Sequence, residues 1–264
     1  MEQLSITHTL KEVHQYRGLV WALVQRHLAQ RYRGSALGFL WSIINPLCLM
    51  LVYVLVFHYY MRSNLVDNYP IFLFCGLLPW VWTSSALMEG ATSIVHSGHL
   101  ITKSMFPAQL LPVVAVITTM VNFVLSLPVL AVFMIVAGVP FYLSLLALPL
   151  LLVLQFVFLV GCGLLLSSLN VIFRDVQHIL GNLLSFLFFL CPIVYPATVV
   201  PEKLRFTLYL NPVALLTQCY QKAILDGVFP SPSDVVYLLA FSCVVALVGN
   251  FVFHRHRESF AELL

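Results

Sequence analysis

The sequence predicts an all-α integral membrane protein, and two observations lead to that class. Of its 264 residues, 61% are hydrophobic and only 9% are charged, whereas soluble domains average about 45–50% apolar and about 25% charged residues. The charges are also clustered, and they leave intervals without Asp, Glu, Lys or Arg at 34–61, 68–88, 104–173, 176–201, 206–221 and 235–254. A soluble core of this size cannot bury so much apolar surface, so the solvent of the chain must be lipid.

The uncharged intervals predict six spans, because a helix needs about 20 apolar residues to cross a bilayer about 30 Å thick. The interval 104–173 is too long for one helix, and Gly138-Val139-Pro140 divides it with a turn. Within a membrane domain of residues 34–254, we expect spans near 36–61, 69–88, 106–138, 142–172, 177–197 and 235–254.

The interval 206–221 is too short to span comfortably, and it contains Asn211-Pro212. We expect it to form short re-entrant or gate helices, near 202–210 and 213–226, in an outer region of residues 198–233.

The N-terminal segment, residues 1–33, is expected to hold an amphipathic helix over 10–33. At 100° per residue, Val20 and Val24 share one side with Trp21, while Arg26 lies on the other. A basic amphipathic helix with a Trp is typical of the membrane interface. A helix packed on a soluble partner is the alternative.

The distribution of Lys and Arg favours a cytoplasmic location for both termini, including the tail 255–264. With the N-terminus inside, nine Lys and Arg residues lie in inner segments and four in outer loops, as the positive-inside rule expects. We expect Arg31, Arg33, Arg174 and Asp175 to mark the inner boundary of the spans. The net charge of +3 then reports topology and gives no reason to expect a nucleic-acid partner.

Several function classes are disfavoured by what the sequence lacks. No metalloprotease, nucleophile-elbow or P-loop motif occurs, and the six cysteines stand singly, so we expect no catalytic residues and no metal site. No span interior carries a charged residue, which disfavours coupling to protons or sodium. If the chain transports, its energy is expected to come from another polypeptide.

Aromatic and amide side chains stand out in spans one and five. Aromatic faces pack on the C–H faces of sugars, and amides exchange hydrogen bonds with hydroxyls, so these residues suit an uncharged path for a carbohydrate. The candidates are Asn45, Tyr53, Tyr59, Asn182, Phe186, Phe189 and Tyr195. Asn182, Phe186 and Phe189 share one helical face. Interfacial aromatic belts, a packed bundle core or a dimer interface are the alternatives.

Three stretches resemble the membrane subunits of polysaccharide ABC exporters: RYRGSALGFLWSIINPL at 31–47, FRDVQHIL at 173–180 and LNPVALLTQCYQKAIL at 210–225. The resemblance covers essentially the whole chain. It implies a multi-pass protein of the cytoplasmic (inner) membrane that forms a homodimer, bound to two copies of a separate ATPase. That complex would move a lipid-linked glycan, of O-antigen, capsular or teichoic-acid type, to the outer leaflet.

The resemblance also implies that the loop 89–106 holds a coupling helix seated in the ATPase. We expect a helix over Ser93–Ser104, with His96, His99, Leu100 and Lys103 contacting the ATPase; a plain connector is the alternative. ATP would be bound by the partner, so this chain is expected to need no cofactor and to be no enzyme. The alternative interpretations of the sequence are a permease of the same architecture for a drug or lipid, an intramembrane lipid-modifying enzyme, or a structural membrane subunit without a substrate path.

Overall fold

The computed structural model describes residues 6–35, 37–60, 66, 68–103 and 106–264, and it describes the backbone only at 6–10, 32, 39, 102, 103, 261 and 262. Within these residues the fold is all-helical, without strands. The helices are α1 Ile6–Gln15, α2 Arg17–Tyr32, α3 Trp41–Tyr53, α4 Tyr69–His96, α5 Gly98–Lys103, α6 Leu110–Val136, α7 Leu148–Ile172, α8 Val176–Leu190, α9 Phe206–Leu210, α10 Pro212–Gln221, α11 Pro232–His256 and α12 Phe260–Leu263.

Among the described residues, five helical segments are long and apolar enough to cross a membrane. They are Trp41–Tyr60, Tyr69–His96, Leu110–Val136, Leu143–Ile172 and Pro232–Ser259. The first joins α3 to a π-helical continuation, and the fourth joins a 3₁₀ turn to α7. The turn expected between the third and fourth spans is present, with Gly138 at φ +68°, a backbone conformation that glycine adopts without strain.

The helix at the fifth expected span, 177–197, is shorter than the sequence predicts. α8 ends at Leu190 after 15 residues, which corresponds to about 22 Å of helix. Cys191 has an extended backbone, with ψ 142°, because the following residue, Pro192, disfavours the helical conformation before it. α8 is therefore not one of the five long candidate spans.

The N-terminal segment forms two helices where the sequence predicts one over 10–33. Tyr16 interrupts them, with φ −96° and ψ 20°. Val20, Leu23 and Val24 of α2 are buried and form a cluster with residues of α6. Trp21, which was predicted to share their face, is instead 56% exposed.

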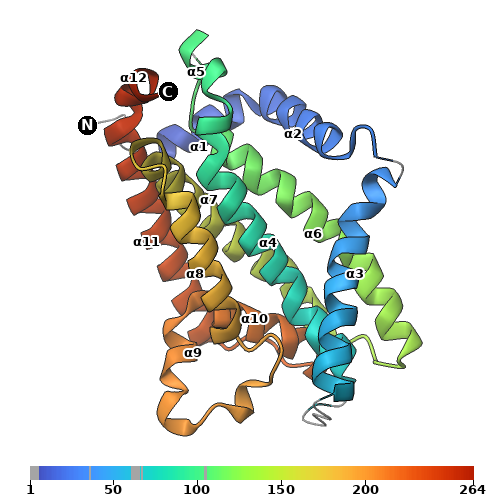
Figure 1. Ribbon diagram of the computed structural model, residues 1–264. Coiled ribbons are helices and arrows are strands. Elements are labelled where there is room, and N and C mark those ends of the chain that lie inside the picture. Colours follow the sequence, from blue (N-terminus) through green and yellow to red (C-terminus); the bar gives the residue numbers. More distant parts are fainter. Residues whose placement is uncertain (1–5, 36, 61–65, 67, 104–105) are drawn as a thin grey trace.

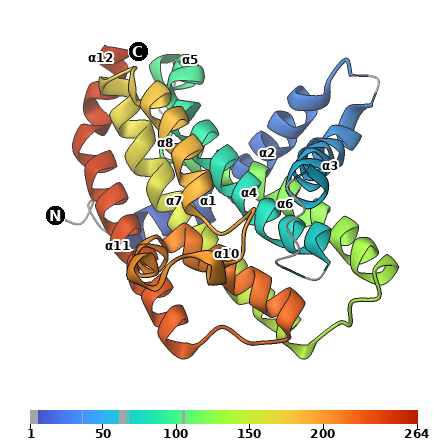
Figure 2. The same ribbon diagram turned by 60° about the horizontal axis from the view of Figure 1, so that its bottom comes forward.

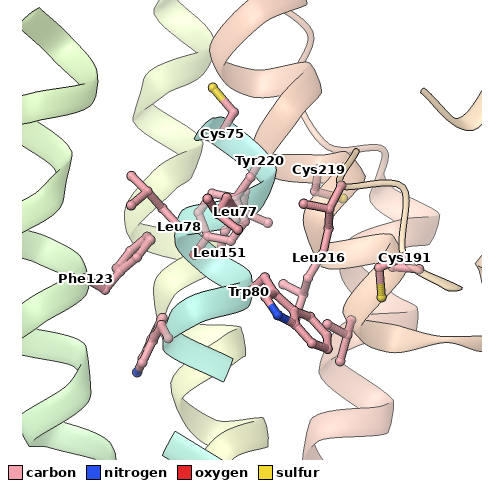
Figure 3. Packing of buried hydrophobic residues seen from close by; sticks show 14 of the residues in the cluster. Cys75, Leu77, Leu78, Trp80, Phe123, Leu151, Cys191, Leu216, Cys219 and Tyr220 are labelled. Carbon is pink, nitrogen blue, oxygen red and sulfur yellow. The ribbon is translucent and has the colours of Figure 1, made fainter. Parts of the chain in front are cut away.

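The central element of the bundle is α4, which other helices surround on several sides (Figures 1 and 2). Its apolar residues are not confined to one stripe, as expected for a buried helix: Leu73, Leu77, Trp82 and Ala86 are each at most 2% exposed. In Figure 3, Leu77, Leu78 and Trp80 of α4 lie among residues of α6, α7 and α10, with Phe123 of α6 on one side and Leu216 of α10 on the other.

α4 also continues eight residues beyond its expected end at 88, to His96. The helix predicted over Ser93–Ser104 is therefore not one element. Its first part is the end of α4, and its second part is the short helix α5.

The two ends of the bundle carry different elements. α2, α5 and α12 lie at one end, which we call the α5 end (Figure 1). α9 and α10 lie at the opposite end, across the bundle, in the region where short helices were expected. Asn211 begins α10 by accepting a hydrogen bond from the backbone N–H of Val213 at 3.1 Å, which satisfies one of the unpaired donors at a helix N-terminus.

Candidate functional site

An open groove of about 450 Å³ lies between α3, α4 and α8. We call it the aromatic groove. It is lined by Leu49, Tyr53, Leu77, Trp80, Val81, Ser84, Ser85, Leu184, Ser185, Phe188 and Phe189. None of these lining residues is charged, so within the described part of the chain the groove is a neutral surface of rings and hydroxyl groups.

The rings of the groove are held by a buried phenylalanine of α8. Phe188 stacks on Tyr53 of α3, with ring centroids 5.3 Å apart, and lies 5.6 Å from the ring of Trp80 of α4. Offset and tilted ring pairs at such distances are attractive, so Phe188 ties the three helices together. Its neighbour Phe189 is 60% exposed and faces outward.

Two of the predicted path residues, Tyr53 and Phe189, line this groove. Asn182 and Phe186 are exposed on the same face of α8 as Phe189, without lining the groove themselves. Tyr195 lies in the turn beyond the end of α8, where its hydroxyl donates a hydrogen bond to the Phe189 carbonyl at 2.7 Å. It therefore contacts the end of the exposed face of α8.

The remaining two predicted residues of span one lie apart from the aromatic groove. Tyr59 is 65% exposed in the π-helical segment that follows α3. Asn45 is exposed near the start of α3 and lines a different cavity, between α3, α4 and α6.

The contribution of α4 to the groove was not predicted. Trp80 and Ser84 are separated by four residues and so lie on one helical face, a spacing that can be read from the sequence. That α4 is the central helix, and so forms the floor of a groove between α3 and α8, depends on tertiary packing and is not readable from one sequence.

A second cavity, of about 640 Å³, lies at the α5 end between α2, α4, α5 and α6. We call it the α2–α5 cavity. Unlike the aromatic groove it carries charge: Arg31 Nη1 donates a hydrogen bond to Glu89 Oε1 at 2.9 Å. Arg26 and His27 also line it, and burial, followed by the charge of Arg26, lowers the pKa of His27.

The residues predicted to couple to an ATPase meet at this cavity. His96, His99 and Leu100 line it, and both histidines are exposed. Leu100 is half-buried and packs on a cluster that includes Phe253 and Phe260 of the C-terminal region. The side chain of Lys103 lies outside the described residues.

The other residues expected at the inner boundary are exposed. Arg33 directly follows α2, and Arg174 and Asp175 form the short connection between α7 and α8. That connection lies at the α5 end of the bundle (Figure 1).

Apolar helices long enough to cross a membrane, flanking an uncharged groove, define an integral membrane protein of the channel or transporter class. The chain belongs to the ABC-2 type transporter family, whose model matches residues 18–225.

The relatives carry the names of polysaccharide export components. The chain is 42% identical to the O-antigen export system permease protein RfbA of Myxococcus xanthus over 255 residues, which are 96% of this chain and 98% of the relative. It is 30% identical to the protein of the same name from Klebsiella pneumoniae, over 93% of this chain and 95% of the relative. The polysialic acid transport protein KpsM of Escherichia coli is 27% identical over 91% of this chain and 94% of the relative.

Proposed function

We propose that this chain is the permease subunit of an ATP-driven exporter that moves a lipid-linked polysaccharide across the cytoplasmic membrane. The observation that carries the proposal is the uncharged aromatic groove between α3, α4 and α8. It occurs in a chain whose relatives are named for O-antigen, polysialic acid and capsule export. In this role the chain is a transport subunit and not an enzyme.

The chemistry of the groove suits a glycan. The exposed ring of Phe189 and the partly exposed ring of Tyr53 offer apolar surface to the C–H faces of sugar rings. Ser84 and Ser185 donate their hydroxyl protons to the carbonyls of Val81 and Gly181, and their oxygens remain able to accept hydrogen bonds from a sugar. Because the lining carries no fixed charge, successive sugars of a long chain meet the same potential as they pass.

A homodimer would convert the open groove into an enclosed path. In a single chain, Phe186 is 69% exposed and Phe189 is 60% exposed on α8. A second copy placed against the faces of α3 and α8 would cover these rings and enclose a neutral passage. The exposed rings support this arrangement, because an enclosed path needs aromatic surface that is free in the monomer.

The ATPase is proposed to bind at the α5 end, where His96, His99 and Leu100 surround the α2–α5 cavity. Two ATPase copies, one for each permease chain, would supply ATP hydrolysis, so this chain needs no cofactor of its own. This end, with both termini, would face the cytoplasm. The charged pair Arg31–Glu89 and the exposed Arg33 and Arg174 suit that side.

Deletion of the gene in its native host tests the proposal. We expect the completed lipid-linked glycan to accumulate inside, so that an antibody or lectin against it stains permeabilised cells and no longer stains intact ones. Expression of the wild-type chain should restore surface staining. Normal surface glycan in the deletion strain, together with loss of drug or lipid efflux, would instead favour a permease for one of those substrates.

A further inference from the structure

A third cavity, of about 540 Å³, lies on the other side of α3 from the aromatic groove, between α3, α4 and α6. We call it the α3–α6 cavity. Its polar lining consists mainly of hydroxyl and amide side chains, among them Ser42, Asn45, Ser85, Thr119, Asn122 and Ser126. These residues belong to helices that qualify as membrane spans, so the cavity is a polar space among membrane-spanning helices.

One buried donor in this lining has no partner within the described chain. Trp82 is only 2% exposed, and its indole Nε1 makes no hydrogen bond. Its ring stacks on Phe123, another lining residue, with centroids 5.1 Å apart. An unpaired donor in an apolar environment costs free energy. The Nε1 atom is itself buried, so an acceptor on a ligand reaches it only when the Trp82 side chain shifts toward the cavity.

The hydroxyl groups of α6 supply the complementary acceptors. Thr119 Oγ1 donates to the Ala115 carbonyl at 3.0 Å, and Ser126 Oγ donates to the Asn122 carbonyl at 2.9 Å. Each hydroxyl proton is thus used within the helix, while the oxygen lone pairs remain able to accept. Asn45 adds an amide with both donors and an acceptor. The cavity therefore offers both kinds of hydrogen-bonding partner.

The described lining is mostly uncharged, which favours an uncharged ligand. Arg31 is the charged side chain among the described lining residues, and its guanidinium is paired with Glu89 at 2.9 Å. An acyl chain would offer the Asn45 amide no hydrogen-bond partner. A neutral sugar ring, with hydroxyl groups around an apolar body, satisfies the donors and acceptors and packs on the aromatic faces. The volume lies within the range of about 300–1,000 Å³ usual for small-ligand sites.

The cavity and the aromatic groove adjoin the same stretch of α4. Val81 and Ser85 of α4 line both spaces, so the cavity and the groove lie on either side of α3 and share this part of α4. α3 itself is lightly held, since only Pro46 and Met50 are buried along it. We propose that the α3–α6 cavity binds a neutral sugar ring, and that its ligand is the lipid-proximal sugar of the exported glycan. This inference rests on the proposed function.

Photo-crosslinking in glycan-producing cells tests the site. A benzophenone amino acid is placed at Asn122 in the cavity, at Phe189 in the groove, and at Val124, which is 42% exposed on α6 and lines neither space. We expect a permease band that reacts with antibody to the glycan from Asn122 and Phe189 but not from Val124. Two results would contradict the proposed site. In the first, glycan crosslinks form at Phe189, but the yield at Asn122 is no higher than at Val124. In the second, the probe at Asn122 crosslinks to phospholipid alone. Failure at Phe189 as well would count against the proposed function itself.

Filling the cavity provides a second, independent measurement. Ser126→Leu adds apolar volume and removes an acceptor, and we expect roughly tenfold slower appearance of surface glycan at equal permease level, equivalent to about 1.4 kcal/mol. Ser126→Thr keeps the hydroxyl and should export near the wild-type rate, as should Val124→Leu on the outer face. Wild-type export by Ser126→Leu would contradict the proposal. If that variant does not accumulate, the crosslinking result decides.

Discussion

The variant Gly249→Ala is expected to unfold at a markedly lower temperature than the wild-type protein. α7 and α11 cross in backbone contact, and a Cβ at Gly249 would meet the carbonyl oxygen of Gly161. The facing position on α7 is also tight, because a Cβ at Gly161 would lie 2.6 Å from the backbone nitrogen of Ala246. Close approach of small residues is a common basis for helix association in membranes, and here backbone atoms leave no flexible side chain to move aside.

Overpacking of this kind typically costs about 1–3 kcal/mol, and a rigid backbone contact places the cost at the upper end. With about 2–4 °C of melting temperature per kcal/mol for a chain of this size, we expect a decrease of roughly 6–12 °C, measured by thermal unfolding of the purified permease in detergent. Gly181→Ala on α8 is the matched control, because a Cβ there meets nothing within 4 Å. Equal melting temperatures for both variants would show that α7 and α11 do not cross at these glycines.

The variant Leu100→Pro is expected to insert normally and yet to lose nearly all export. The backbone N–H of Leu100 donates to the Ser97 carbonyl at 2.9 Å, bridging the break between α4 and α5. Proline cannot make this bond, and its ring disfavours the preceding helical turn. α5 would then lose its orientation beside the α2–α5 cavity, so ATP hydrolysis by the proposed partner would no longer drive transport.

The assay compares surface glycan with ATP hydrolysis by the purified complex. We expect at least roughly tenfold less surface glycan, equivalent to more than about 1.4 kcal/mol of lost coupling, while hydrolysis continues. Leu100→Ala keeps the hydrogen bond and removes packing against Phe260 and its cluster, so it should reduce export far less. Wild-type export by Leu100→Pro would mean that α5 is a passive connector.

The sequence predicts the class of the fold well, because charged side chains are costly to desolvate in lipid and the membrane-spanning segments therefore appear as intervals without charge. The same reasoning misplaces the end of α4. Glu89 was taken as a boundary, but the helix continues through it to His96, and the Glu89 carboxylate forms an ion pair at 2.9 Å with Arg31 of another helix. A long-range partner of this kind leaves no local signal.

The candidate site was predicted in part. Aromatic content and helical spacing identified Tyr53 and Phe189, which line the groove. The two faces of α3 were not distinguishable from its sequence, so Asn45 was assigned to the same path although it lines the cavity toward α6. The early end of α8 follows from Pro192, a local signal that uncharged-interval counting ignores.

The exposed face of α8 is proposed to contact the transported glycan, and thiol labelling measures this contact directly. Asn182, Phe186 and Phe189 are each replaced by a single cysteine in a variant that lacks the six native cysteines. A cysteine at Val132 is the control, because Val132 is 58% exposed on α6 and does not line the groove. With ATP hydrolysis arrested and no substrate present, a bulky water-soluble reagent should label the three α8 positions and not the control. A trapped glycan should protect them. If the three α8 positions resist labelling in every state, or if the glycan does not change their labelling, the proposed contact between α8 and the glycan is wrong.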